Sequence, residues 1–560
     1  MILLCYILLL PSFCFAWAPR LVRHDEHFTP DVILRVTAKS IPIACTTRFT
    51  VVINETTPGP LIVLGEGKVT WIRVYNDISG QNLTMHWHGL SQSTAPFSDG
   101  SPMASQWPIP PGHFFDYEVR PQYGEAGTYF YHSHVGFQAV SASGPLIVRD
   151  SQDPPYLYDE ERIIVLTDYF SKSDAQVEQG LTSDQFTWSG ETEAILVNGQ
   201  GTINNSTSGG PSCCLGSLSV EPSKTYRFRI IGSTALSFVS MAFEGHDMMI
   251  IEADGGYTQP LPISHLQVGV GQRYSVLVRT KSERELYTEG RTKFFLQLES
   301  RERPTLTRSY AVLEYPREKY DNIQPPEIPP IGLPNTTYDW VDNDLSPLFP
   351  NNFPSLANVT RRVIVKVEQI INGSITWRQN GAPWDETFPQ TPYLVALYQN
   401  NEVALPSYDV AVANGLGMDP RVRAFPAHIG EVLEIVIQNS GSTAGALDVH
   451  PFHSHGLHFY DIGSGPGTYN VTENELSLQF RKPIQRDTTM LYRYSTAAPT
   501  GQDAGWRAWR VRVTDPGVWM IHCHTLQHMI MGMYLVSLRA LYSQEIIAFG
   551  SECLHVKVPG

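Results

Sequence analysis

Alternating hydrophobic and polar positions predict strands along most of this sequence. Three segments share one arrangement, in which a turn residue precedes an alternating run and a polar stop follows it: EGKVTWIRVYND from Glu66, EPSKTYRFRIIGS from Glu221 and IGEVLEIVIQNS from Ile429. A period of two is typical of half-buried strands, and helical periodicity is scarce here. Three strands in equivalent roles predict three related domains.

A second shared pattern separates the outer thirds of the chain from the middle third. A glycine, an aromatic residue and a His-x-His pair recur in GTYFYHSH from Gly127 and GVWMIHCH from Gly517, whereas the middle third offers only TKFFLQLES from Thr292. We therefore expect the first and third domains to carry the chemistry and the second mainly to space them. The 43 glycines and 41 prolines give frequent turn signals, which are typical of all-β sandwiches.

Composition places the expected domain boundaries. A chain of 560 residues is too long for one ordinary core. The first 18 residues, MILLCYILLLPSFCFAWA, predict a signal peptide cut after Ala18, although its start carries no positive charge. VRDSQDPPY suggests a boundary near residue 155, and NIQPPEIPPIGLP an extended linker. We expect domains at 19–155, 156–321 and 335–560, with the linker at 322–334.

Charge and sorting signals restrict the environment and partners of the protein. A formal net charge of -15 and a pI near 5.6 argue against nucleic acid or an anionic membrane as a partner. No second apolar run of about 18 residues follows the signal, so we expect a secreted protein with no membrane span. We also expect a monomer. Asn82 fits the glycosylation pattern but lies just before His86. Other sequons predict N-glycans at Asn54, Asn204, Asn205, Asn335, Asn358, Asn372 and Asn470.

The heptapeptide HCHTLQH concentrates metal-ligand chemistry near the C-terminus. If residues 518–524 form a strand, His522 and His524 project to one face and Cys523 to the other, so one strand end serves two metal centres. His528 and Met533 follow at short distances. Two histidines, a thiolate and a weak axial methionine are the ligands of a blue copper site. A single zinc site would not need histidines on the opposite face.

Three further His-x-His pairs occur, in MHWHG, YHSHVG and HPFHSHG, so that ten of the 18 histidines fall in four clusters. With His450 and His528 assigned to the copper of Cys523, eight imidazoles remain for a three-copper cluster between the outer domains. Four coppers store the four electrons that convert dioxygen to water. Cys523 then gives electrons a short covalent path between the centres. The lone histidines are interpreted as ordinary core or surface residues: 24, 27, 113, 246, 265, 428, 458 and 555.

These four motifs resemble, in order, the copper motifs of the multicopper oxidases, over nearly all of the mature chain. TAPFSDGSPMASQWPIPPG, ILVNGQG and IIEADGGYTQP resemble the ascorbate oxidase and fungal laccase-like branch. The resemblance implies three consecutive cupredoxin-like (plastocyanin-like) Greek-key β-sandwich domains and four coppers. It assigns the type 1 copper to His450, Cys523, His528 and Met533, the type 2 copper to His86 and His453, and the type 3 pair to His88, His132, His524 and to His134, His455, His522.

The resemblance also implies roles for a few other residues. Asp99 in FSDG matches an acid that helps to deliver protons to reduced oxygen, with a simple turn residue as the alternative. Leu526 stands where many members carry a carboxylate, and Met533 where high-potential laccases carry a non-ligating Leu or Phe. In the family a disulfide joins the first two domains, which implies a bridge from Cys45 to Cys213 or Cys214. Cys553 is expected to be unpaired, because Trp107 stands where relatives place its partner.

The sequence leaves four possible functions. A laccase-like oxidase would take single electrons from phenols, such as polyketide or naphthol types, at His450 or His528, and the radicals would couple. Ascorbate oxidase is the runner-up, but its aromatic pocket is only partly matched: Trp377 stands where that family has an indole, whereas Tyr169 and Phe170 stand where tryptophans are expected. Trp377 fits core packing as well. A ferroxidase needs carboxylates around the type 1 histidines, which are not evident. Copper storage or electron carriage would need no three-copper cluster.

Overall fold

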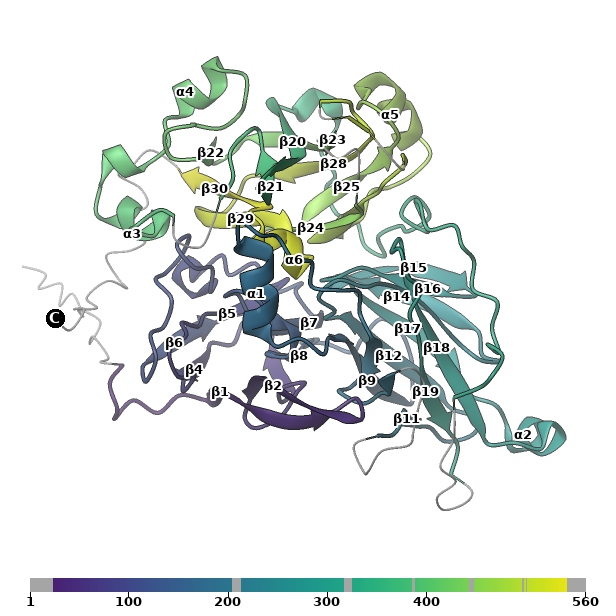
Figure 1. Cartoon of the computed structure of the whole chain (residues 1–560). Helices are drawn as coiled ribbons and strands as arrows, with labels where there is room; N and C mark the ends of the chain where they lie inside the picture. The colour runs from purple at the N-terminus through teal and green to yellow at the C-terminus, as the bar shows by residue number, and fades with distance from the viewer. Residues whose placement is uncertain are drawn as a thin grey trace, which may run out of the picture.

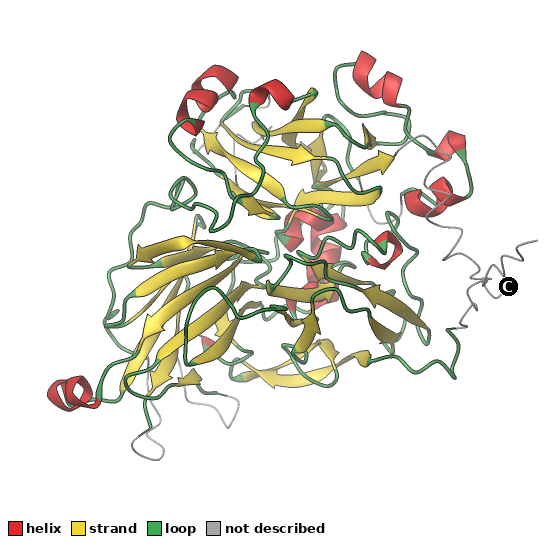
Figure 2. Cartoon of the chain, turned by 180° about the vertical axis from the view of Figure 1, so that it is seen from behind, coloured by secondary structure: helices red, strands yellow, loops and turns green. Residues whose placement is uncertain are grey.

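The structure is a computed structural model that describes residues 24–203, 213–316, 325–384, 388–442, 448–495, 498–499 and 501–540. The predicted signal peptide, Asn204, Asn205 and Cys553 lie outside these residues. Six β-sheets, paired into three sandwiches, form the body of the described chain. The third domain sits across the other two (Figure 1), and strands dominate all three (Figure 2). The expected all-β, three-domain fold is confirmed.

In the first domain two four-stranded sheets face each other. In sheet order, the strands are β2 (Thr46–Ile53), β1 (Val32–Ile43), β4 (Thr70–Asn76) and β6 (Phe114–Val119), then β3 (Ile62–Gly65), β8 (Ser143–Arg149), β7 (Gly127–Ser133) and β5 (Met85–His88).

The second domain has sheets of six and five strands. They are β10 (Ala194–Val197), β9 (Glu160–Tyr169), β12 (Thr225–Gly232), β17 (Arg273–Arg279), β14 (Met248–Ala253) and β15 (Gly256–Ile263), then β11 (Gly216–Ser219), β19 (Arg308–Glu314), β18 (Lys293–Arg301), β13 (Phe238–Phe243) and β16 (Leu266–Val268).

The third domain repeats this plan. Its strands are β21 (Ser374–Gln379), β20 (Arg361–Asn372), β23 (Val432–Ser442), β28 (Gly505–Arg512), β25 (Phe459–Gly465) and β26 (Gln485–Arg486), then β22 (Ala424–His428), β30 (Tyr534–Ala540), β29 (Gly517–Cys523), β24 (His450–Ser454) and β27 (Thr488–Leu491).

The three repeated sequence segments form β4, β12 and β23, and these strands are equivalent. Each pairs parallel with the first strand of its own domain, β1, β9 or β20. Each also pairs antiparallel with a later strand, β6, β17 or β28. The repeat therefore marks the same position in three copies of one sandwich. The exact boundaries at 155 and at 322–334 stay predictions.

Helices are short and lie at the edges, except for two near the centre. They are α1 (Asp174–Thr182), α2 (Glu283–Glu289), α3 (Tyr393–Tyr398), α4 (Tyr408–Ala413), α5 (Val471–Leu478) and α6 (Leu526–Ile530). α1 and α6 pack against each other where the domains meet (Figure 1). In the part of the chain that the structure describes, no helix is both long and apolar enough to cross a membrane.

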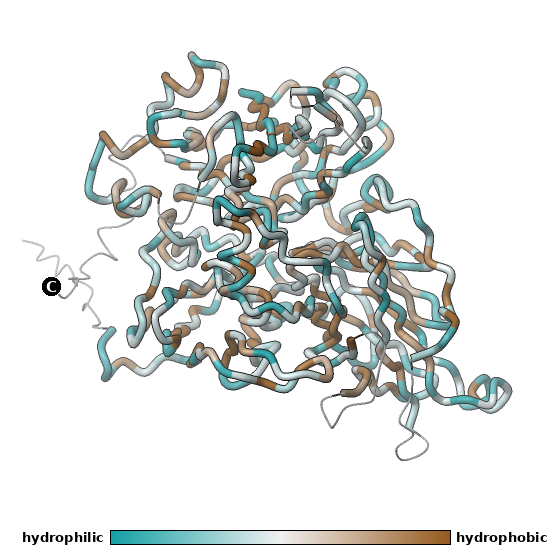
Figure 3. Tube along the Cα trace, in the orientation of Figure 1, coloured by the Kyte–Doolittle hydropathy of each residue, from teal (hydrophilic) through white to brown (hydrophobic). Residues whose placement is uncertain are grey.

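Buried apolar side chains form one large core in each domain, and the third core extends into its neighbours. It includes Met103 and Phe137 from the first domain and Phe170 and Leu236 from the second. Figure 3 shows hydrophobic and hydrophilic residues alternating along the chain in all three domains. The domain interfaces are therefore packed like interiors, which keeps groups from different domains at fixed distances.

A disulfide joins the first two domains. Cys45, in the turn between β1 and β2, is bonded to Cys213 before β11. The bridge implied by the family resemblance is confirmed, and Cys213 rather than Cys214 is the partner.

Candidate metal centres

The predicted metal-ligating histidines lie on or beside four strands that meet between the first and third domains. In the first domain β5 pairs with β7, and His86 lies opposite His132. In the third domain β24 pairs with β29, and His453 lies opposite His522. Residues two apart on a strand share a face, which explains the His-x-His spacing. The structure brings eight buried imidazoles together: His86, His88, His132, His134, His453, His455, His522 and His524.

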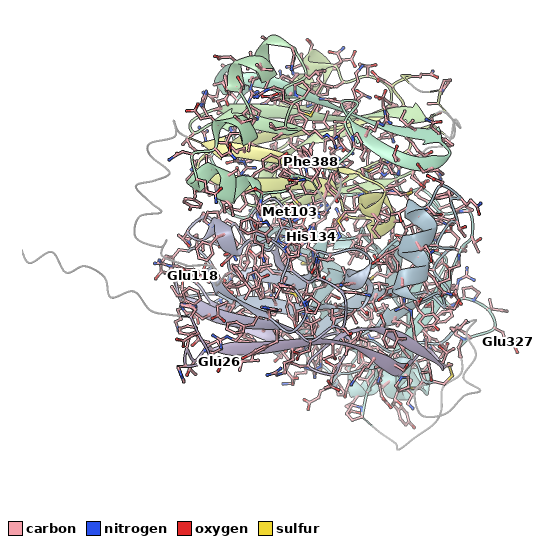
Figure 4. All side chains as sticks on the ribbon, turned by 60° about the vertical axis from the view of Figure 1, so that its left-hand side comes forward. Glu26, Met103, Glu118, His134, Glu327 and Phe388 are labelled. Carbon is pink, nitrogen blue, oxygen red and sulfur yellow. A yellow bond between two sulfur atoms is a disulfide. The ribbon has the colours of Figure 1, made fainter. Side chains whose placement is uncertain are left out.

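Contacts between these histidines cross the domain interface. Nδ1 of His88 lies 3.0 Å from Nε2 of His524. Nε2 of His522 lies 3.4 Å from Nε2 of His134 and 3.1 Å from Nε2 of His455. Figure 4 shows His134 at the seam between the two domains. One predicted type 3 set consists of His134, His455 and His522, and the ligand atoms of these three residues lie within 4.8 Å of one another. The division of the other five histidines between centres stays a prediction.

The free ring nitrogens of this cluster fit bound metal ions. Within the described residues, several are buried and have no hydrogen-bond partner: Nε2 of His86, His132 and His453, and Nδ1 of His134 and His524. Burial lowers the pKa of His132 to about 4. Burial, and then the neighbouring histidines, lower the pKa of His134 and His524 well below its usual value. Neutral rings keep a lone pair for a metal, and an all-imidazole donor set suits copper.

The opposite ring nitrogens are held by backbone carbonyl groups. Nδ1 of His86 donates to the oxygen of Asp99 at 2.6 Å, and Nδ1 of His453 to that of Asp487 at 2.9 Å. Nδ1 of His132 donates to the Ser133 oxygen at 2.8 Å. Such bonds fix the ring orientation and leave Nε2 as the ligating atom.

The second centre gathers around Cys523. Its Sγ atom lies 3.7 Å from Nδ1 of His450 and 3.6 Å from Nδ1 of His528, and all three side chains are buried. β29 ends at Cys523 and α6 begins at Leu526, which returns His528 to the thiol. Met533 is fully buried in the same core, and its carbonyl oxygen accepts a hydrogen bond from the Cys523 amide at 3.1 Å. The structure thus brings together the thiol and both imidazoles of the predicted type 1 set and places the backbone of Met533 beside Cys523, while the axial role of the Met533 side chain stays a prediction.

One strand end serves both centres, as its alternation predicts. His522 contacts His134 and His455 of the larger cluster, while the thiol of Cys523 faces His450 and His528. Burial raises the pKa of this thiol to about 12. The thiol is therefore protonated at neutral pH, and a metal bound at this centre would take the place of the proton.

Asp99 touches the larger cluster directly. It is fully buried, its Oδ2 atom lies 2.9 Å from Nδ1 of His455, and it accepts a hydrogen bond from Ser101. Burial raises the pKa of Asp99. A Cβ atom on the next residue, Gly100, would lie 1.8 Å from the Met85 oxygen, so only glycine fits there. Asp99 thus contacts a predicted copper ligand, and its role in proton delivery stays a prediction.

Two carboxylates beside the histidines were not predicted. Oδ1 of Asp487 lies 3.3 Å from Nε2 of His88. Oδ2 of Asp448 lies 3.3 Å from Nε2 of His528. Asp448 corrects the interpretation that carboxylates near the type 1 histidines are not evident. Its only signal was its position two residues before His450.

The two predicted substrate residues lie in different places. The Trp377 ring centroid is 4.8 Å from that of His450 and 5.2 Å from that of His528, but the side chain is fully buried. Tyr169 is buried in a separate cluster, where its hydroxyl lies 2.6 Å from Oγ1 of Thr46. Its neighbour Phe170 joins the core around Cys523, so Tyr169 faces away from the type 1 residues. The structure therefore does not bring Tyr169 to this centre.

Comparisons with known proteins agree with this geometry. Three models described as multicopper oxidase match residues 35–153, 160–315 and 387–540. Laccase-like multicopper oxidase 1 of Thermothelomyces thermophilus is 48% identical over 91% of this chain and 87% of its own length. Multicopper oxidase aurL2 of Gibberella zeae is 46% identical over 95% and 91%, and the L-ascorbate oxidase of Cucumis sativus 29% over 88% and 86%.

Solved structures show the same fold. The crystal structure of Fet3p, a multicopper oxidase that functions in iron import, superposes with a TM-score of 0.74 at 22% identity, and covers 94% of this chain and 93% of its own.

Proposed function

Because the chain belongs to the multicopper oxidase family, which binds one type 1, one type 2 and two type 3 coppers, we propose that it is a laccase-like phenol oxidase. It is a copper oxidoreductase with dioxygen as the acceptor. Copper held by the clustered histidines and Cys523 would supply one-electron oxidation of the donor and four-electron reduction of dioxygen to water. In this proposal the donor is a phenol of the polyketide or naphthol type, and its radicals couple after release.

The contact between Asp448 and His528 carries the proposal. A phenol that gives up an electron next to His528 also has to give up its hydroxyl proton. Burial alone would raise the pKa of Asp448, but the hydrogen bond and charge of His528, together with Arg303, hold it far below the usual value. A carboxylate that stays ionised beside the type 1 histidine can accept the hydrogen bond of a phenol. The hydroxyl becomes strongly acidic as its electron leaves, so that even a weakly basic carboxylate can then take the proton.

The residues around Asp448 suit a neutral aromatic electron donor. Arg303 donates to both Glu191 oxygens at 2.7 and 2.8 Å and to Oδ1 of Asp448 at 3.1 Å. The Trp188 ring lies beside the same guanidinium, with 5.6 Å from its centroid to Cζ. Two carboxylates against one guanidinium leave a net negative charge, which disfavours the ascorbate anion. The aromatic surface of Trp188 favours a phenol ring.

Iron(II) is the second candidate donor, because carboxylates attract cations. However, Arg303 engages both oxygens of Glu191 and one oxygen of Asp448. Only Oδ2 of Asp448 is left without the guanidinium, and it lies 3.3 Å from Nε2 of His528, so these residues offer few free carboxylate oxygens to an iron ion.

Oxygen consumption by the copper-loaded protein tests the choice of donor. A dihydroxynaphthalene, ascorbate and Fe(II) should be compared at equal concentration. We expect the highest kcat/KM for the dihydroxynaphthalene, with coupled dimers as products. A preference of tenfold or more for ascorbate or Fe(II), about 1.4 kcal/mol in transition-state stabilisation, would reject the laccase-like function.

We further propose that the protein is a secreted, N-glycosylated monomer. The disulfide fits an oxidising compartment. The sequons that the structure describes are exposed at Asn54, Asn82, Asn335, Asn358, Asn372 and Asn470. Mass spectrometry of the secreted protein before and after glycosidase treatment tests the glycans.

A further inference from the structure

The second domain reaches the three-copper cluster although it supplies none of the predicted ligands. The turn between β16 and β17 passes beside two ligating histidines. A Cβ atom on Gly271, whose φ is +88°, would lie 2.9 Å from Cε1 of His88 and 3.2 Å from Cδ2 of His524. The backbone of the second domain therefore packs on histidines from both other domains, and only glycine leaves room for them.

Arg273 begins β17 and joins the three domains. It is fully buried and donates from both terminal nitrogens to the two carboxylate oxygens of Asp487, each at 2.6 Å. Its Nε donates to the carbonyl oxygen of Thr128 in the first domain at 3.1 Å, and Nη1 to that of Gly271 at 3.0 Å. The bidentate pair fixes the plane of the carboxylate, because the guanidinium is itself held from both sides.

Asp487, which Arg273 holds in a fixed orientation, contacts the ring nitrogens of neighbouring histidines. Its Oδ1 atom lies 3.3 Å from Nε2 of His88 and 3.4 Å from Nδ1 of His453. Its Oδ2 atom lies 3.3 Å from Nε2 of His458, which also donates to the Gly89 oxygen at 2.8 Å. One carboxylate thus contacts a histidine of the first domain and a histidine of the third.

We propose that Arg273 and Gly271 of the second domain position the histidines that hold the copper cluster. Arg273 acts through Asp487 on His88 and His453, and Gly271 acts by direct packing on His88. The inference rests on the proposed assignment of these histidines as copper ligands. Residues that orient metal ligands typically change metal affinity 10–100-fold when they are mutated. The second domain therefore sets the ligand geometry as well as the spacing.

The test compares Arg273→Lys with Arg486→Lys. Arg486 is also fully buried at the interface of the second and third domains, where its Nε donates to Asp254 at 2.7 Å. None of the contacts described for Arg486 is with a ligating histidine. Lysine keeps the charge at both sites, and only at position 273 does it remove a bidentate pair, the one with Asp487. Copper per chain, the rate of copper loss to a chelator, the type 2 electron paramagnetic resonance signal and the melting temperature should be measured.

We expect Arg273→Lys to lose cluster copper at least about tenfold faster than the wild type and to change the type 2 signal, while the blue type 1 band remains. Arg486→Lys should lower the melting temperature by a similar amount but keep copper retention and the type 2 signal. Wild-type copper retention and signal in Arg273→Lys would overturn the proposal. These readouts need no donor, so they are independent of whether the enzyme prefers phenols.

Gly271→Ala provides a second test if Arg273→Lys does not fold. Its control is Gly430→Ala, because Gly430 has a similar φ of +95° with nothing within 4 Å of its Cβ position. Both variants strain the backbone, but only Gly271→Ala pushes on His88 and His524. Faster copper loss in Gly271→Ala alone supports the proposal, and equal retention in the two variants contradicts it.

Discussion

Asp448 places its Oδ2 atom 3.3 Å from Nε2 of His528, so a carboxylate adjoins the histidine at which electrons should enter. We predict that Asp448→Asn lowers kcat/KM for phenols by about 100-fold, a usual effect of losing a general base. Ferrocyanide releases an electron but no proton. Its oxidation should change by less than about threefold, as measured by oxygen uptake.

The blue type 1 band serves as the control for Asp448→Asn. An unchanged band shows that His450, Cys523 and His528 still hold their copper. Equal losses for phenols and ferrocyanide would mean that Asp448 supports the copper site and does not accept a proton.

Cys523→Ser should separate the two centres. Without the thiolate we expect no blue colour and no oxidation of donors, because the thiol faces only the type 1 group, with Sγ 3.7 Å from His450 and 3.6 Å from His528. The eight histidines of the cluster are untouched, so copper per chain should fall from about four to about three. A blue and active variant would contradict the type 1 assignment.

The ligand strands could be predicted from the sequence because short-range geometry determines them. Alternation along a strand is enough to send Cys523 and His522 to opposite faces, and the structure shows these opposite contacts. The repeat also identified equivalent strands, because β4, β12 and β23 each have the same neighbours in their domains.

The surroundings of the ligands could not be predicted, because they come from distant parts of the chain. Arg273 meets Asp487 across 214 positions, and Arg303 meets Asp448 across 145. No local pattern marks these pairs. For the same reason the sequence did not identify the right aromatic residues for the proposed substrate site. Tyr169 packs in another core, whereas Trp188, which the sequence did not single out, lies beside Arg303.

Met533→Leu should raise the type 1 reduction potential, because it removes a weak axial donor while keeping a buried apolar side chain of similar volume. Less electron-rich phenols should then be oxidised faster. Redox titration of the blue band gives the potential, and oxygen uptake gives the rates. Met531→Leu, a buried methionine of the same core, is the control and should leave the potential unchanged.

The disulfide between Cys45 and Cys213 links residues 168 positions apart in the sequence and should stabilise the contact between the first two domains. Cys45→Ser should lower the free energy of unfolding by about 2–4 kcal/mol. Thermal unfolding of the purified protein measures the change. Cys214→Ser, next to the bridge, should have a much smaller effect, because Cys45 is bonded to Cys213, and equal losses in the two variants would contradict this pairing.

Glu252 lies at the interface of the first and second domains, and its charge makes the stability of this interface depend on pH. Its side chain is fully buried on β14 and accepts hydrogen bonds from the amide of Thr128 at 2.6 Å and from Arg227 at 2.5 Å. Burial alone would raise the pKa of Glu252, but the charges of Arg227 and Arg229 outweigh burial and hold it at about 2. A lowered pKa means that the ionised form stabilises the fold, by on the order of 3 kcal/mol. This contribution is complete above the unfolded value near 4.5 and is lost as the pH falls toward 2.

Glu252→Gln should therefore lower the melting temperature clearly at pH 6, and the difference from the wild type should shrink steadily between pH 4.5 and pH 2. Copper-free protein should be used for both, so that metal loss in acid does not enter the comparison. Glu26→Gln, at an exposed position (Figure 4), should cause little change at any pH. A difference between Glu252→Gln and the wild type that stays constant down to pH 2 would show that the charge of Glu252 does not hold the two domains together.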